Sequence, residues 1–194
     1  MTILNAIRLS AVLATSLLLS GCFVTSKQMP AGTGPINDDA IVGDWRGIDP
    51  DTGQAEQVFI HIQKFDPAKP LRIVFVEDKK YEIYELRTTQ VGNRHVFSAK
   101  ILEPAEAVKE SHGGAFLGYY EVKGDQADFY LLDAGKVSAL IRQGKARGIP
   151  GKQTYDLAEL TGSPAELAAF LGSDAGWNAK VDSPARLRRV PMPK

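Results

Sequence analysis

Short segments of alternating or continuous apolar residues recur along the chain, and turn-forming residues separate them. The segments cover residues 41–48, 58–62, 71–76, 81–88, 93–102, 115–122 and 126–132. In the second segment, Val58, Ile60 and Ile62 share one face, as the two-residue period of a strand requires. Between the last two segments, Gly124 and Asp125 are typical of a two-residue hairpin turn. This succession predicts an antiparallel meander, and hence a barrel or a sandwich.

The C-terminal third of the chain has a different pattern. Residues 134–145 carry apolar side chains at helical spacing. The run Ser163-Pro164-Ala165-Glu166 is typical of a helix start, with a serine N-cap, a proline in the first turn and a glutamate at the third position. Residues 155–160 and 185–190 are expected to be strands. The sequence therefore predicts a mainly β fold, an antiparallel barrel-like meander with two short C-terminal helices.

The N-terminus carries an apolar stretch of limited length. One positive charge, Arg8, directly precedes a run of apolar and small residues that spans residues 9–19. A membrane-spanning helix needs about 20 apolar residues. A shorter run behind a basic residue is typical of a secretory signal peptide. We therefore expect residues 1–21 to be a signal peptide.

The residues Leu19-Ser20-Gly21-Cys22 close this stretch, and Cys22 is the only cysteine of the chain. They resemble the lipobox of bacterial lipoproteins. The resemblance implies cleavage before Cys22, lipid attachment at Cys22 and a membrane held through that N-terminal anchor. Phe23 follows where an aspartate commonly signals retention in the inner membrane, so the resemblance implies a periplasm-facing protein of the outer membrane. The alternative is an ordinary secretory signal with a chance cysteine.

The residues that follow the cysteine contain several helix- and strand-breaking positions. Pro30, Gly32, Gly34 and Pro35 interrupt any regular element. We expect residues 22–40 to form a flexible tether that carries the lipidated Cys22. Residues 41–194 are then long enough for a single β-rich globular domain.

Gly43-Asp44-Trp45 stands at the start of the first predicted strand. It resembles the Gly-x-Trp motif that begins lipocalins and lipocalin-like bacterial domains. In that family the tryptophan closes one end of the barrel, and an arginine from a late strand packs over its ring. The resemblance implies this role for Arg188 or Arg189, and Arg189 faces inward if Leu187 does. It makes Trp45 and Arg189 the candidate ligand-binding residues, whereas a buried tryptophan beside a glycine bend is the alternative.

Charge and motifs narrow the function classes. Basic and acidic residues number 23 each and the isoelectric point is near 6.8, so the sequence predicts no nucleic-acid partner. No nucleophile elbow, zinc-protease helix, phosphate loop or dinucleotide turn occurs, so we expect neither an enzyme nor a cofactor. His61, His95 and His112 lie far apart without a short-spaced pair, so we expect no metal site.

Two functions stay open. The first is an envelope interaction or assembly role with a filled core, which predicts an exposed apolar patch or an unprotected strand edge. The second is lipocalin-like binding of a small apolar or amphipathic ligand, which predicts an apolar cavity of at least roughly 300 Å³. Packed small β domains outnumber hollow ones, which favours the first. The aromatic residues of the strands are candidates either for a core or for a cavity lining: Phe75, Tyr84, Phe97, Tyr119, Tyr120, Phe129 and Tyr130.

Overall fold

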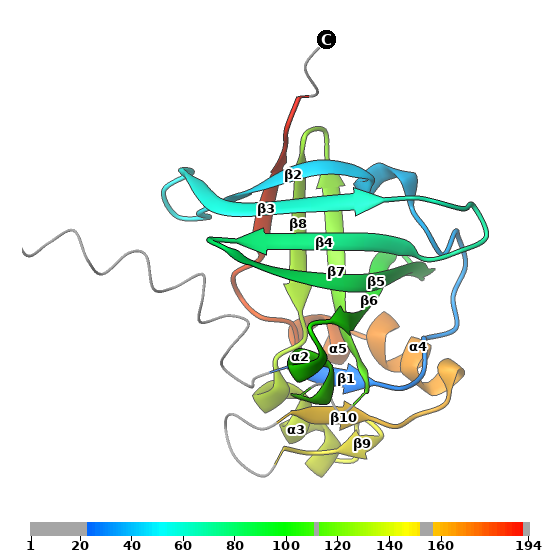
Figure 1. Cartoon of the computed structure of the whole chain (residues 1–194). Helices are drawn as coiled ribbons and strands as arrows, with labels where there is room; N and C mark the ends of the chain where they lie inside the picture. The colour runs from blue at the N-terminus through cyan, green and yellow to red at the C-terminus, as the bar shows by residue number, and fades with distance from the viewer. Residues whose placement is uncertain (1–22, 111–112, 152–156, 192–194) are drawn as a thin grey trace, which may run out of the picture.

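A computed structural model describes residues 23–110, 113–151 and 157–191, and it contains a closed antiparallel barrel of eight strands (Figure 1). Neighbours in the barrel follow the order β2-β3-β4-β5-β6-β7-β8-β11, and β11 returns to pair with β2. The strands are β2 (Gly43–Ile48), β3 (Ala55–Gln63), β4 (Leu71–Glu77), β5 (Lys80–Val91), β6 (Arg94–Glu103), β7 (Ala115–Lys123), β8 (Gln126–Leu131) and β11 (Ala185–Arg189). The predicted mainly β, barrel-like meander is confirmed, and the sandwich is not formed.

Alternating side chains of each strand point into the barrel. Strands β3 and β4 pair so that Ile60 lies opposite Phe75 and Ile62 lies opposite Ile73. All four side chains belong to, or pack against, one buried cluster inside the barrel. The face predicted for Val58, Ile60 and Ile62 is therefore the inner face.

The tight turns form where the sequence predicts them. Lys123 pairs with Gln126 across the hairpin between β7 and β8, and Gly124 has a φ of 59°. Glycine occupies this left-handed region without the steric cost that a side chain brings. The hairpin fixes which residues of β7 and β8 face inward, because register follows from turn length.

A lobe of helices and short strands is inserted between β8 and β11. It consists of α3 (Ala134–Arg142), β9 (Gly148–Ile149), β10 (Ala158–Leu160), α4 (Pro164–Gly172) and α5 (Asp174–Asn178), and it lies at one end of the barrel (Figure 1). The two predicted helices are α3 and α4, whereas α5 and α2 (Ala105–Glu110), which follows β6, were not expected. The lobe has its own buried cluster, which includes Val24, Leu132, Val137, Ala158, Leu160, Leu167, Phe170 and Leu171.

Helix α4 begins at the predicted capping box. The Glu166 amide donates to Ser163 Oγ at 3.3 Å, and the Ser163 amide donates to Glu166 Oε2 at 2.8 Å. The hydrogen bond from the Ser163 amide, together with the Ser163 side chain and the nearby Arg147, lowers the pKa of the Glu166 carboxyl group to about 2. Arg147 Nη1 lies 3.1 Å from Glu166 Oε1, so this arginine has a partner within the chain.

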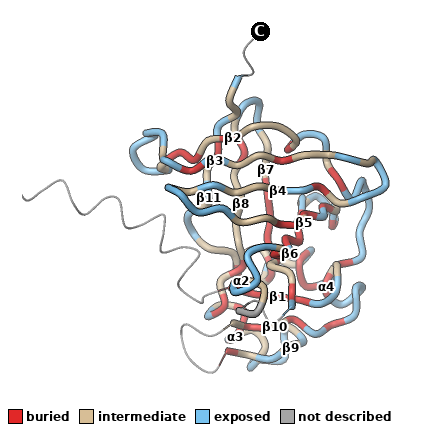
Figure 2. Tube along the Cα trace, viewed as in Figure 1, coloured by how far each residue is buried: buried red, intermediate tan, exposed pale blue. Residues whose placement is uncertain are grey.

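The described part of the predicted tether, residues 23–40, differs from the expectation of flexibility. Strand β1 (Val24–Ser26) pairs in parallel with β10 and antiparallel with β7, and all its residues are buried (Figure 2). Farther along, the side-chain amide Nδ2 of the buried Asn37 donates to the carbonyls of Pro67 and Lys69 at 2.7 and 2.9 Å. The prolines and glycines of residues 30–35 interrupt regular elements, but they do not exclude packing against the barrel.

One end of the barrel is closed around Trp45. A short 3-10 helix, η1 (Asp39–Ile41), precedes β2, and Trp45 Nε1 donates to the Ile41 carbonyl at 2.8 Å. The Arg189 guanidinium lies 4.2 Å from the centre of the Trp45 ring. It also donates to the carbonyls of Val42 and Ala40 at 2.6 and 2.8 Å. The predicted packing of Arg189 over Trp45 is therefore confirmed.

The glycine of this motif has a physical reason. Gly43 has a φ of 137°, in the region that disfavours side chains, and a Cβ there would lie 2.6 Å from Arg189 Nη1. Gly43 thus leaves the space that the guanidinium occupies. The closure joins the first strand of the barrel to the last one.

We predict that Arg189→Ala lowers the free energy of unfolding by about 2 kcal/mol, because it removes a cation–π contact and leaves two carbonyls without a partner. Urea unfolding measures the change. The matched control is Arg188→Ala on the outer face of the same strand, expected to stay within about 0.5 kcal/mol of the parent. Equal losses in both variants would show that Arg189 has no special role.

Candidate functional site

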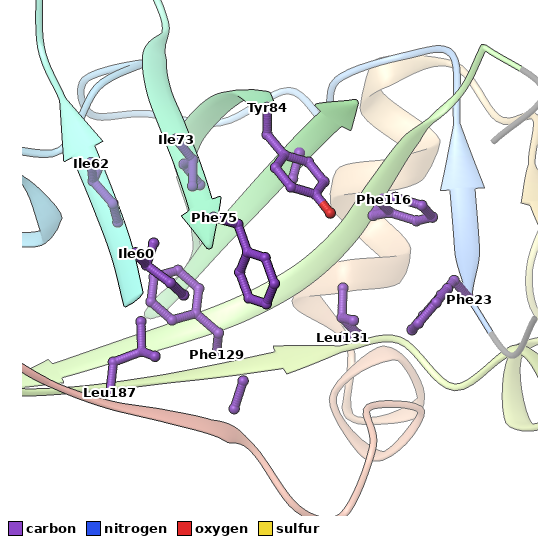
Figure 3. A pocket seen from close by; sticks show the side chains of 12 residues that line it. Phe23, Ile60, Ile62, Ile73, Phe75, Tyr84, Phe116, Phe129, Leu131 and Leu187 are labelled. Atoms are coloured by element: carbon purple, nitrogen blue, oxygen red, sulfur yellow. The ribbon is translucent and has the colours of Figure 1, made fainter. Parts of the chain in front are cut away.

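The barrel interior holds an apolar cavity of about 140 Å³ (Figure 3). Side chains from opposite walls point into it, among them Ile60, Phe75, Tyr84 and Phe129. The full lining is Phe23, Ile60, Ile62, Ile73, Phe75, Tyr84, Ala99, Phe116, Phe129, Leu131, Ala185 and Leu187. Within this lining the Tyr84 hydroxyl is the only polar side-chain group, so the cavity offers a ligand almost solely apolar contact.

A second, larger cavity of about 330 Å³ adjoins the first toward the open end. The two cavities adjoin, because they share seven lining residues: Phe23, Ile60, Phe75, Phe129, Leu131, Ala185 and Leu187. The mouth is formed by the loop after β2, residues 49–51, and by residues 183–184 before β11. Volumes of roughly 300 Å³ and more are those of small-molecule sites.

Phe23 lies at this mouth and was not expected to belong to the fold. Its side chain is buried and packs edge-on against Phe116, with 5.3 Å between ring centres. Its carbonyl accepts a hydrogen bond from the Ala158 amide at 3.2 Å. Both its backbone and its ring are therefore held by the folded chain. In the sequence, the signal for this burial was that an apolar residue, Phe23, directly follows the cysteine.

The aromatic candidates separate into three groups. Phe75, Tyr84, Phe97 and Phe129 line the cavities. Tyr120 is buried elsewhere in the barrel cluster, and its hydroxyl donates to Asp38 Oδ2 at 2.7 Å. Tyr119 and Tyr130 pack against Trp177 of the lobe, with ring centres 5.1 and 6.4 Å away. Sequence alone could not separate them, because both faces of β7 and β8 are covered.

The mouth carries carboxylates on one side. Asp49, Asp51, Glu56 and Glu77 line the larger cavity. Burial raises the pKa of Glu56, and the charges of Asp49 and Glu77 raise it further. Burial also raises the pKa of Glu77, with Asp78 and Glu82 acting in the same direction and Lys80 opposing them. These carboxylates lie close together at the mouth, which disfavours additional negative charge there.

Tyr84 stays neutral inside the cavity. Its hydroxyl donates to Glu82 Oε2, and burial together with that carboxylate raises its pKa well above the ordinary value. A phenol held in this way keeps its proton at neutral pH. It supplies a fixed dipole rather than a base.

Trp45 and Arg189 line neither cavity. They lie together at the closed end, where they hold the barrel shut, and a direct contact of either with a ligand stays a prediction. The lipid-attachment residue Cys22 and the predicted signal peptide lie outside the described residues.

The two histidines that the structure describes, His61 and His95, have separate partners. His61 contacts Asp44, and His95 packs against the Tyr120 ring with 5.2 Å between ring centres. His112 lies outside the described residues. Within residues 23–110, 113–151 and 157–191, no group of three or more His, Cys, Asp or Glu side chains is arranged to hold a metal ion.

No model of a known protein family matches the chain, and neither a curated protein nor a solved structure matches it significantly. The eight-stranded antiparallel barrel is compatible with a lipocalin-like fold. Over the residues that the structure describes, no helix is both long and apolar enough to cross a membrane.

We predict that Glu56→Gln stabilises the protein at neutral pH. The folded-state pKa of Glu56 is raised, so its ionised form opposes folding above that pKa, and the opposition fades as pH falls toward 4.5, the ordinary value. Denaturant unfolding at neutral pH and below pH 4.5 measures this. The variant's advantage is expected at neutral pH and is expected to vanish at the acidic pH.

The matched control is Glu121→Gln. Glu121 lies on the outer face of β7, where its carboxylate is 2.9 Å from Lys123 Nζ. Removing that charge is not expected to stabilise the protein. An advantage of Glu56→Gln that persists below pH 4.5 would show that a cause other than the buried charge is at work.

Proposed function

We propose that this protein binds a small apolar or amphipathic molecule inside its barrel and does so without catalysis. The two adjoining cavities carry the proposal. The inner one, about 140 Å³, is apolar, and the larger one, about 330 Å³ with a mixed lining, has the volume of a small-molecule site, whereas a filled interior would have opposed the proposal. The neutral Tyr84 and the absence of other polar side chains from the inner cavity's lining favour binding over chemistry.

A protein-interaction role is the second candidate, and an outer-face patch favours it. Phe59 of β3 lies opposite Val76 of β4, which lies opposite Tyr81 of β5. Their side chains are 47%, 38% and 55% exposed, so three neighbouring strands present an apolar row to solvent. The Arg46 guanidinium lies 5.2 Å from the Phe59 ring and borders the row. Such rows occur in protein interfaces. Barrel closure leaves the eight strands without a free edge, so the patch is the better support for this role.

We also propose that Cys22 is acylated and holds the protein at the periplasmic side of the outer membrane. The support is the lipobox resemblance of Leu19-Ser20-Gly21-Cys22. Phe23 is already buried at the cavity mouth, and one residue spans no more than about 3.6 Å. An anchor at Cys22 would therefore keep the mouth beside the membrane surface, where apolar molecules are available.

We predict saturable binding of the uncharged fluorophore N-phenyl-1-naphthylamine, one molecule per chain, with a rise in its emission. Ala99 lines the inner cavity, so Ala99→Phe fills part of it and is expected to weaken binding about tenfold. Ala185→Phe is a second filling variant at a more exposed lining position, in case the first fails to fold.

The control for these variants is Ala165→Phe, on an exposed position of α4 outside both linings. It is expected to bind the fluorophore as the parent does. The proposal is contradicted if the parent does not bind, or if folded filling variants bind as tightly as Ala165→Phe.

We predict that the chain, expressed in a Gram-negative bacterium, incorporates labelled palmitate and that Cys22→Ser does not. Intact mass of the mature protein is expected to show an N-terminus at residue 22 with acyl chains attached. Equal labelling of Cys22→Ser, or a mature N-terminus elsewhere, would refute the anchor while leaving the ligand-binding proposal untouched.

A further inference from the structure

We propose that the ligand is a cationic amphiphile, whose apolar tail enters the barrel while its protonated amine or quaternary ammonium group stays at the mouth. This inference rests on the proposed function. It adds the chemical class of the ligand, and it comes from the different chemistry of the two adjoining cavities.

The inner rows of two neighbouring strands change from apolar to acidic at the mouth. On β3 the inward row Ile60 and Val58 ends in Glu56, and on β4 the inward row continues from Phe75 to Glu77. Val58 pairs with Glu77, so the two glutamates are diagonal neighbours across the β3–β4 pair. The acidic pair thus stands directly above the apolar lining.

The next strand and the neighbouring loop extend this acidic side. Glu82 of β5 pairs with Phe75 of β4 and accepts the hydrogen bond of the Tyr84 hydroxyl. On the other flank, Asp49 accepts from the amides of Asp51 and Thr52 at 2.8 and 3.0 Å. These bonds fix the orientation of the Asp49 carboxylate at the mouth.

Little positive charge offsets these carboxylates. In the described part of the chain, the side chains of Glu56 and Glu77 form no ion pair. Lys80 of β5 pairs with Glu77 across the turn between β4 and β5, but its side chain is exposed. Among the described residues, Arg186 alone of the basic side chains lines the larger cavity, and it donates two hydrogen bonds of 2.9 and 3.1 Å to Asp128.

The opposite side of the mouth is apolar. Phe23, Leu131, Val181 and Pro184 line it. A ligand that fits both sides has an apolar body and a positive group at one end, because a negative head would meet several carboxylates at short range. A bare divalent cation fits less well, since the acidic side chains of residues 23–110, 113–151 and 157–191 do not gather into a metal site.

The test uses three probes with the same ten-carbon tail: decyltrimethylammonium, decanol and decanoate. Their affinities for the purified chain are measured by titration calorimetry below the concentrations at which they aggregate. The ammonium probe is expected to bind about tenfold more tightly than decanol, with decanoate the weakest. Raising the salt concentration is expected to reduce that preference, because salt screens partly exposed charges.

The variant test replaces both mouth glutamates. In Glu56→Gln/Glu77→Gln, the ratio of ammonium to decanol affinity is expected to fall about tenfold. The matched control Glu121→Gln removes a carboxylate from the outer face of the barrel and is expected to keep the ratio of the parent.

The outcomes separate this inference from the proposed function. If decanol binds but decanoate binds as tightly as the ammonium probe, the cavity is a ligand site and the inference is wrong. An unchanged affinity ratio in the double variant also overturns the inference. If none of the three probes binds, the proposed function fails and the inference fails with it.

Discussion

Closure of the barrel depends on strand β11, which pairs with β2 on one side and β8 on the other. At its end, Arg189 reaches across the Trp45 ring and donates to two carbonyls of the segment before β2. This places the last strand beside the first, although the whole lobe lies between β8 and β11 in the sequence. Such an insertion is tolerated because the entropy of closing a loop grows only slowly with its length.

The lobe supports the barrel wall from outside. Tyr119 faces outward from β7, and its hydroxyl donates to the Leu171 carbonyl at 3.0 Å while its ring packs against Trp177. A wall braced in this way, and closed at one end by Trp45, can leave the interior incompletely filled. The side chains that line the apolar cavity of about 140 Å³ have fewer packing partners than those of a filled core. A ligand that fits this space would supply such contacts, so the cavity and the proposed binding role are physically linked.

The sequence predicted those features that depend on local rules. The two-residue turn at Gly124 and Asp125, the shared face of Val58, Ile60 and Ile62 on β3, and the capping box of α4 each follow from a few neighbouring residues. The packing of Arg189 over Trp45 was also predicted, from a family resemblance combined with strand alternation.

The features that sequence reasoning missed depend on partners far along the chain. Asn37 is held by carbonyls about thirty residues away, so its segment looks like a linker until the barrel is present. The alternation of β3 and β4 places Glu56 and Glu77 on the inner face of the barrel. They line the mouth because Trp45 closes the opposite end of the barrel. Hydrophobic periodicity predicts which side chains share a face of a strand. It does not predict which end of the barrel is open.

Native mass spectrometry of the protein, purified without denaturation from a bacterial envelope, tests most directly whether the barrel is a ligand site. We expect a fraction of the chains to carry a small-molecule adduct that is lost on denaturation, and we expect filling the cavity with Ala99→Phe to abolish it. An adduct-free mass for the parent, or the same adduct on the filled variant, would contradict a ligand site inside the barrel and would move the function to its outer surface.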